Sequence, residues 1–270
     1  MKMRLSSFGF VKDIDAIANA GFDCIEMHYK EIIPMDEGEF RVACKKLKDS
    51  PLTAEVFNNP LPLDKQIIAP EFKLADYRDH LIKGADRAAE MGARFCNFGN
   101  GRTRSLPIEG TKAELQAALS KILECIAMLC EINAERNITV LLEPLSSVVS
   151  NFIMNIPETL ALVEELGVYN LKPFIDLRWF VDEKRPYEEI ITYADQIAHI
   201  HIDNPLPAFP TRYIPRVTDE FDYAPLFDSL KKTCYKGIIS CEANVFENFE
   251  HDLKYLMAFF NYYGIEPYRA

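Results

Sequence analysis

The chain has 270 residues, with 30 Lys and Arg against 41 Asp and Glu, and its formal net charge is −11 at pH 7. Hydrophobic residues make up 49% and charged residues 26%, which suits a globular chain with a large core and excludes a disordered chain. The negative charge also argues against nucleic acid as a partner, because acidic surfaces repel phosphate backbones.

Neither a membrane span nor an export signal is predicted. The apolar runs, such as residues 138–142, are far shorter than the roughly 18 to 20 residues of a bilayer helix. The first residues lack the basic and apolar regions of a secretory signal, and the seven cysteines contain no CxxC pair. We therefore expect no membrane partner, a cytoplasmic location and reduced thiols.

Eight short apolar runs are predicted to be strands, at residues 4–8, 23–28, 53–57, 95–99, 139–143, 173–177, 197–202 and 237–242. Each is followed by apolar residues at helical spacing, around residues 14–18, 40–47, 81–91, 115–129, 159–166, 187–194, 226–230 and 253–260. Eight such pairs in about 250 residues are typical of a (β/α)₈ TIM barrel. We predict an α/β fold with one domain over residues 1–270.

Polar residues end four consecutive strands of this barrel. In TIM barrels these carboxyl ends meet at the mouth where chemistry takes place. A carboxylate buried there needs a partner, and a shared divalent cation is one solution. The oxygen-rich set favours Mn²⁺ or Mg²⁺, with Co²⁺ or Zn²⁺ possible. The ligand candidates are Glu143, Asp176, His201 and Glu242.

Two alternatives apply to the same residues. Each acid could instead cap a loop amide or pair with Arg178, Arg212 or Arg216. His199 and His201 are two apart on one strand and therefore point to the same face. His201 is nearer the mouth and is the ligand candidate, while His199 and Asp203 are predicted to support the ligands from behind.

The ordered strand ends resemble the xylose isomerase-like TIM-barrel superfamily, which includes sugar phosphate isomerases and ketose 3-epimerases. The similarity is carried by AEVFNNPLPLDKQIIAPE, FGNGRTRSLPIEG, LLEPLSSVVSN, FIDLRWF, HIHIDNP and ISCEANVF. This resemblance implies that Glu143, Asp176, His201 and Glu242 bind one metal ion. It also implies that Glu143 and Glu242 form an acid/base pair acting through an enediolate.

The segments around the metal ligands depart from the family pattern. Arg178 and Trp179 stand where these epimerases usually have an aromatic residue and a histidine, and Ser146 and Ser147 replace an Asn-Arg pair. Arg212 is too distant from His201 to align with the family's arginine. Seven residues are nevertheless predicted to contact the substrate: Arg178, Trp179, Asn151, Arg102, Arg104, His28 and Glu55.

The combined prediction is a metal-dependent isomerase or epimerase acting on a small sugar or sugar-like hydroxy carbonyl compound. The altered segments leave two alternatives: a catalytically silent barrel that binds a sugar or metabolite, and a lyase or hydrolase on the same metal scaffold. The resemblance also implies a homo-oligomer, either a dimer or a tetramer.

Overall fold

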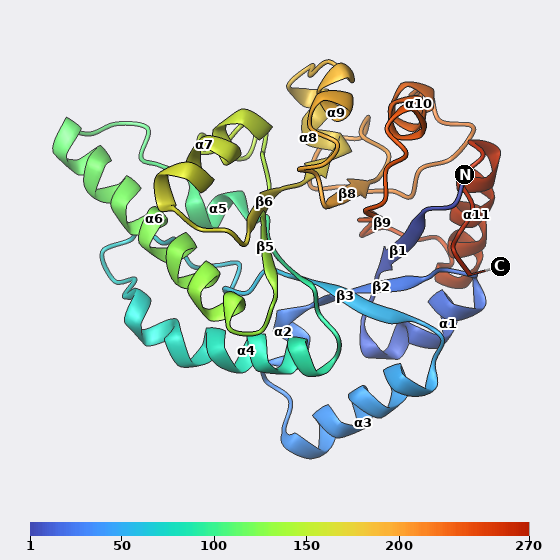
Figure 1. Cartoon of the computed structure of the whole chain (residues 1–270), viewed down its shortest axis with the longest axis horizontal. Coiled ribbons are helices and arrows are strands. Elements are labelled where there is room, and N and C mark those ends of the chain that lie inside the picture. The colour runs from blue at the N-terminus through green and yellow to red at the C-terminus, as the bar shows by residue number, and fades with distance from the viewer. Residues whose placement is uncertain (270) are drawn as a thin grey trace.

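The computed structural model describes residues 1–269, in which parallel strands form a ring surrounded by helices (Figure 1). One sheet contains the strands in the order β6-β5-β4-β3-β2-β1-β9-β8-β7. The strands are β1 (Arg4–Phe8), β2 (Cys24–His28), β3 (Thr53–Asn58), β4 (Phe95–Phe98), β5 (Thr139–Leu142), β6 (Leu171–Pro173), β7 (Ile175–Asp176), β8 (His199–Ile202) and β9 (Ile238–Cys241). The predicted TIM barrel is confirmed.

One predicted strand differs from the prediction. Residues 173–177 do not form a continuous strand, because β6 pairs with β5, β7 pairs with β8, and Phe174 interrupts the two pieces. Pro173 ends β6 and has no N–H to donate to the ladder. Leu177 already belongs to the next helix, since Asp176 accepts a hydrogen bond from the Arg178 N–H at 2.8 Å and caps it. β6 and β7 thus occupy one position in the ring.

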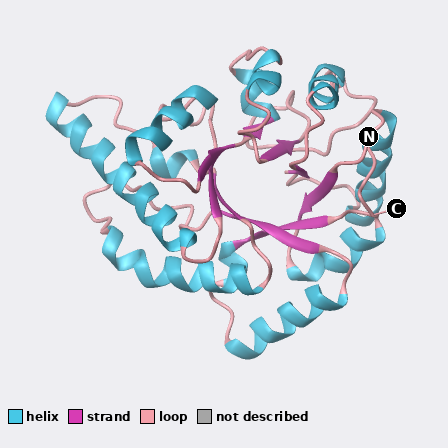
Figure 2. Cartoon of the chain, in the orientation of Figure 1, coloured by secondary structure: helices cyan, strands magenta, loops and turns pink. Residues whose placement is uncertain are grey.

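The helices lie outside the ring of strands (Figure 2). In the described residues they are α1 (Ile14–Asn19), α2 (Tyr29–Ile32), α3 (Glu37–Asp49), α4 (Arg78–Glu90), α5 (Gly101–Arg104), α6 (Lys112–Ala134), α7 (Ile156–Leu166), α8 (Leu177–Asp182), α9 (Glu188–Thr192), α10 (Ala224–Lys232) and α11 (Phe249–Tyr262). The short helix α5 directly follows β4, within the segment FGNGRTRSLPIEG. None of these helices has the length and apolarity that crossing a bilayer requires.

Local signals set the helix ends. At the start of α3, Asp36 accepts from the Glu39 N–H at 2.8 Å, and Glu39 accepts from the Asp36 N–H at 2.9 Å. This reciprocal pair is a capping box. Gly167 ends α7 with a φ of 61°, a left-handed conformation that glycine adopts without a Cβ clash.

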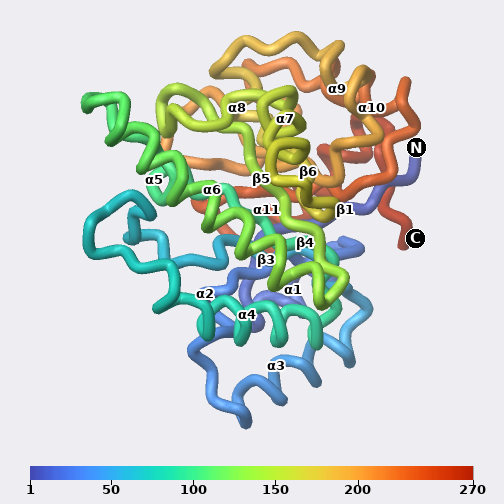
Figure 3. Tube along the Cα trace, turned by 60° about the vertical axis from the view of Figure 1, so that its left-hand side comes forward, coloured from blue at the N-terminus to red at the C-terminus, as the bar shows by residue number. Residues whose placement is uncertain are grey.

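The two chain ends are joined near the amino-terminal side of β1. The Met3 N–H donates to the Glu266 carbonyl at 2.9 Å, and Figure 3 shows both ends at the same edge of the molecule. All seven cysteines are free thiols; five are buried, Cys44 is partly buried and Cys234 is exposed. The opposite edge of the ring, where the strands end, holds the candidate site.

Candidate active site

Four consecutive strand positions deliver the predicted ligands to one point. Glu143 follows β5, Asp176 ends β7, His201 lies on β8 and Glu242 follows β9. One ligand atom from each lies within 4.8 Å of the others, and three of the four residues are buried. Asp176 pairs with His201 in the strand register, which places them side by side. We call this set the four-residue cluster.

His201 is held so that one ring nitrogen faces the cluster. Its Nε2 lies 2.9 Å from Glu26 Oε1, and its Nδ1 lies 3.0 Å from Glu242 Oε2. Within residues 1–269, Nδ1 has no hydrogen-bond partner of acceptable geometry. A carboxylate behind a histidine in this way fixes the ring orientation of metal-ligating histidines. The three carboxylates and this ring nitrogen fit a divalent cation.

His199 lies deeper in the barrel, as its position before His201 requires. Its Nε2 is 2.9 Å from Glu26 Oε2, so the two histidines share one carboxylate, and its ring centroid is 4.8 Å from that of His201. Asn58 also donates to Glu26 Oε1 at 2.6 Å. Glu26, buried completely, therefore organises the barrel interior directly below the four-residue cluster.

Burial and mutual charge shift the pKa values of the cluster in different directions. Burial, with Asp176 and Glu242 nearby, raises the pKa of Glu143 well above its usual range. Burial would also raise the pKa of Asp176, but Arg212 and His201 outweigh it and the net shift is downward. For His201, burial is outweighed by Glu26 and Glu242, so its pKa is raised well above the usual value. The carboxylates thus have different proton affinities.

Arg212 reaches into the cluster from the segment after β8. Its Nη2 lies 2.6 Å from Asp176 Oδ2, and its Nη1 lies 3.3 Å from both Glu242 Oε2 and Asp203 Oδ2. Its backbone N–H donates to Asn244 Oδ1 at 2.9 Å, which ties the segment to the residues that follow β9. Arg212 is thus a fixed cation beside the four-residue cluster.

Three neighbours fix the position of Glu143. The Trp179 indole donates to Glu143 Oε1 at 3.0 Å, and the buried Arg104 guanidinium donates to the Glu143 backbone carbonyl. A Cβ on residue 99 would lie 2.0 Å from Glu143 Oε2, so Gly99 leaves room for that oxygen. The side chain is therefore held by Trp179 on α8 and the backbone by Arg104 on α5, while Gly99 after β4 leaves space for the carboxylate.

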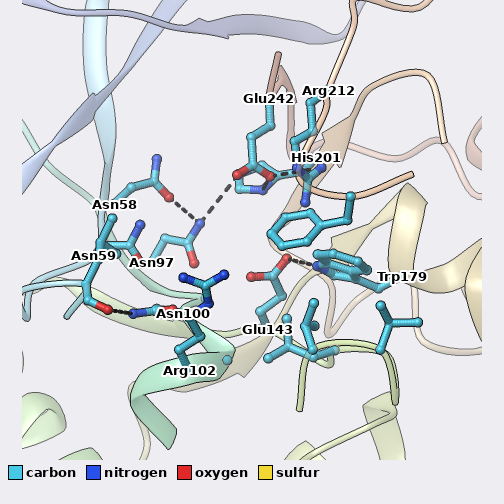
Figure 4. Close-up of a pocket in the computed structure, with 17 residues that line it drawn as sticks. Asn58, Asn59, Asn97, Asn100, Arg102, Glu143, Trp179, His201, Arg212 and Glu242 are labelled. Carbon is cyan, nitrogen blue, oxygen red and sulfur yellow. Dashed lines mark hydrogen bonds and ion pairs between the residues drawn. The ribbon is translucent and has the colours of Figure 1, made fainter. Parts of the chain in front are cut away.

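A cavity of about 350 Å³ opens over the cluster. Figure 4 shows the carboxylates of Glu143 and Glu242 entering it from different sides, with Asn58 and Asn97 opposite them. Of the predicted substrate contacts, Trp179 and Arg102 line this cavity. Arg212 lies 5.1 Å from the Trp179 ring and forms part of the same wall. The cavity combines polar groups with two aromatic side chains, Trp179 and Phe209.

Other predicted substrate contacts have partners elsewhere. Arg178 is buried and pairs with Asp203, and its remaining N–H groups donate to the backbone carbonyls of residues 204, 205, 207 and 211. Arg104 donates to Phe152 O at 2.9 Å as well as to residue 143. Asn151 exchanges two hydrogen bonds with the Leu106 backbone. These three side chains hold loops around the mouth.

Two further predicted substrate contacts, His28 and Glu55, lie away from the cavity over the cluster. Glu55 lies three residues before the end of β3 and accepts from Arg4 at 2.8 Å and Arg94 at 3.0 Å, near the start of the strands. His28 packs against Phe8 and Phe10, and burial is the main cause that lowers its pKa to about 4. Neither borders the cavity over the cluster, although His28 lines a second cavity beside it.

Sequence reasoning missed Asn58, Asn97 and Gly99. Asn97 donates to Asn58 Oδ1 and lies 3.4 Å from His201 Nε2. Both asparagines lie at the carboxyl ends of their strands, so the rule that selected the charged residues also applies to these neutral ones. Gly99 carries no chemical signal in the sequence, because its role is to leave space.

Comparisons with known proteins agree with this architecture. The family model described as xylose isomerase-like TIM barrel matches residues 14–261. A D-psicose 3-epimerase crystallised with D-fructose is 14% identical, with a TM-score of 0.79 over 96% of this chain and 99% of that chain. An L-ribulose 3-epimerase is 19% identical, with a TM-score of 0.76 over 97% and 94%.

A third solved structure is that of an AP endonuclease, family 2, from Brucella melitensis. It is 22% identical, with a TM-score of 0.74 over 100% of this chain and 99% of that chain. No curated protein sequence matches the chain. At these identities the structural matches establish the fold.

Proposed function

Because the chain belongs to the xylose isomerase-like TIM barrel family, we propose that it is a divalent-metal-dependent epimerase or isomerase of a small sugar or sugar-like hydroxy carbonyl compound. The observation that carries this proposal is the four-residue cluster under one cavity, with both glutamates lining that cavity. Two solved structures of similar fold are described as sugar 3-epimerases, which supports the same class of substrate.

The cluster would hold the ion through Glu143, Asp176, His201 Nδ1 and Glu242. Mn²⁺ and Mg²⁺ suit this donor set, and Co²⁺ or Zn²⁺ remain compatible with it. A divalent ion supplies positive charge that stabilises an enediolate formed from a hydroxy carbonyl compound. Glu26 keeps the His201 ring in place from below, through the 2.9 Å contact to Nε2.

Glu143 and Glu242 are the proposed acid/base pair. One carboxylate removes the proton from a carbon beside the carbonyl group, and the other returns a proton to the opposite face. Their different surroundings support separate roles: Glu143 is buried at 5% exposure, whereas the Glu242 side chain is 26% exposed. Trp179 and Gly99 keep Glu143 in position for this transfer.

The remaining cavity wall would bind the hydroxyl groups. Asn58, Asn97 and Arg102 offer hydrogen-bond donors, and the ring of Trp179 offers an apolar face for the sugar carbons. Asn97 Oδ1 is buried without a hydrogen-bond partner among the described residues, so it remains available to accept from a hydroxyl. These contacts would replace the arrangement usual in the family, in which a histidine stands three positions after the aspartate that corresponds to Asp176.

The test is solvent deuterium exchange with Mn²⁺ present, using D-psicose, D-fructose and L-ribulose, followed by mass spectrometry. We expect the wild type to incorporate one deuteron beside the carbonyl group, and Glu143→Gln and Glu242→Gln to lose this incorporation. Glu55→Gln is the matched control. It also removes a buried charge, but near the start of β3 and away from the cavity. Sugar binding without exchange would indicate a silent barrel, and bond cleavage a lyase or hydrolase.

A further inference from the structure

A second, larger cavity lies beside the candidate active site. Its volume is about 870 Å³, within the range of roughly 300 to 1,000 Å³ that ligand sites occupy. Its walls come from the β2–α2 region, the segment after β3, and α4. This second cavity has no part in the proton transfer proposed above.

The two cavities adjoin at the segment after β3. Asn58, Asn59 and Leu63 line both of them. Asn59 has a φ of 55°, a left-handed conformation that is uncommon for a residue with a side chain. Its N–H donates to the Asn97 carbonyl at 2.9 Å, which fixes this turn to β4 at the edge of the active site. A ligand extending from the first cavity across Leu63 would therefore enter the second.

Exposed apolar side chains surround the entrance to the first cavity. Leu63 is 47% exposed, Val148 is 68% exposed and Phe209 is 40% exposed, and all three line the cavity that contains the glutamates. Large apolar side chains left exposed together at a binding pocket indicate an apolar ligand surface. A free sugar presents hydroxyl groups over most of its surface, so this rim exceeds what a free sugar needs.

The second cavity has matching chemistry. Its walls include Ile33, Pro34, Pro60, Leu61 and Pro62. Its charged residues are Lys30, Lys83, Asp64 and Asp79. Their charges cancel, so the cavity has no net charge that would select an ionic ligand. The lining therefore suits a neutral apolar or aromatic group.

We propose that the substrate is a sugar bearing a neutral apolar or aromatic substituent, with the sugar over Glu143 and Glu242 and the substituent crossing Leu63 into the second cavity. This inference rests on the proposed function, because it assigns the reacting end of the substrate to the four-residue cluster. It names a substrate class larger than a free monosaccharide.

The probes are 4-nitrophenyl β-D-glucopyranoside and its two halves, 4-nitrophenol and methyl β-D-glucopyranoside, with binding measured by calorimetry and saturation-transfer NMR at about pH 5.5, where 4-nitrophenol is neutral. We expect saturable binding of 4-nitrophenol to the Mn²⁺-loaded wild type, and tighter binding of the intact glycoside than of either half. Leu63→Asp should weaken it at least about tenfold by placing a charge at the shared rim, whereas Leu63→Phe should retain it. Val42→Asp is the control, because Val42 is 68% exposed on α3 and borders neither cavity.

Equal binding of 4-nitrophenol to the wild type and to Leu63→Asp would overturn the proposal, as would the absence of saturable binding. A dimer in gel filtration that Leu63→Asp converts to a monomer would also overturn it, since a second copy would then cover the rim. The proposed function can fail separately. It fails if the chain still binds 4-nitrophenol but takes up no Mn²⁺, or shows no deuterium exchange with any sugar tested.

Discussion

Arg212 Nη2 lies 2.6 Å from Asp176 Oδ2, so the protein's own cation touches a residue that we propose as a metal ligand. Arg212 Nη1 lies a further 3.3 Å from Glu242 Oε2, and the guanidinium is buried at this position. Charge-assisted hydrogen bonds to a carboxylate reduce the electron density that it offers to a metal. The arginine and a divalent ion therefore draw on the same two carboxylates.

Replacing Arg212 should tighten metal binding. For Arg212→Gln we expect the Mn²⁺ dissociation constant to fall about tenfold, or about 1.4 kcal/mol, because Asp176 and Glu242 lose a competing cation. Isothermal titration calorimetry with Mn²⁺ measures this change. Arg102→Gln is the control, since Arg102 lines the same cavity. Weaker binding in Arg212→Gln would instead show that the arginine orients the ligands.

Glu26→Gln should weaken metal binding by about 10- to 100-fold, because the support behind His201 loses its charge. The amide keeps the shape of the side chain, so the fold should survive. Mn²⁺ titration gives the affinity, and the ¹⁵N shifts of the His201 ring report its tautomer. The control is Glu55→Gln, which changes a buried acid near the start of β3, the strand beside β2. It should leave the Mn²⁺ affinity and the His201 tautomer unchanged. An unaltered ring tautomer in Glu26→Gln would contradict this role.

Gly99→Ala should displace Glu143 rather than unfold the barrel. The added Cβ would lie 2.0 Å from Glu143 Oε2, so the carboxylate has to move. A displacement of about 1 Å is enough to lower the rate of a positioned step by about 100-fold. Deuterium exchange and thermal unfolding measure the two effects separately. Gly38→Ala on α3 provides the comparison, and normal exchange in Gly99→Ala would refute the prediction.

Acid should destabilise the fold through His28. Burial lowers its pKa to about 4 from a usual value of 6.5, so below pH 6.5 the unfolded chain binds a proton that the folded chain does not. The free energy of unfolding should therefore fall between pH 6.5 and pH 4, by up to about 3 kcal/mol from this group. Urea titrations at several pH values should show a smaller fall in His28→Gln and the wild-type fall in His251→Gln.

Arg178→Gln should destabilise the protein by about 3 to 5 kcal/mol, because it removes the main partner of a buried carboxylate. Asp203 is fully buried, and burial raises its pKa to about 7 even with Arg212 and Arg178 nearby. Urea unfolding measures the loss. Arg94→Gln breaks an ion pair whose arginine is 60% exposed and should cost less than about 1 kcal/mol. Equal losses in the two variants would contradict the argument.

The barrel could be predicted because short apolar strands recur along the chain, and the cluster because four of them end in polar residues. Glu143, Asp176, His201 and Glu242 each stand at such an end, and the ring brings these ends together. The height of a residue within the barrel is not encoded by its neighbours along the chain. Glu55 lies too early on β3 to reach the mouth, although nothing in its neighbours along the chain indicates this.

The paths of long side chains and loops could not be predicted either. Arg178 and Trp179 are adjacent on α8, yet the indole borders the cavity and the guanidinium points into the loop after β8. Arg212 is eleven positions beyond His201, and only the folded path of that loop returns it to Asp176. Both outcomes depend on tertiary contacts that spacing along the chain does not encode.

The hydrogen bonds of Arg178 to Asp203 and four backbone carbonyls also determine how this protein meets a ligand. They hold the loop of residues 204–211, which carries Phe209 at the entrance and leads into Arg212. A loop already ordered in this way loses little conformational entropy when a ligand arrives. For the proposed substrate, selectivity at this entrance would therefore arise from complementarity to a preformed shape, and association should be fast because no loop has to fold first.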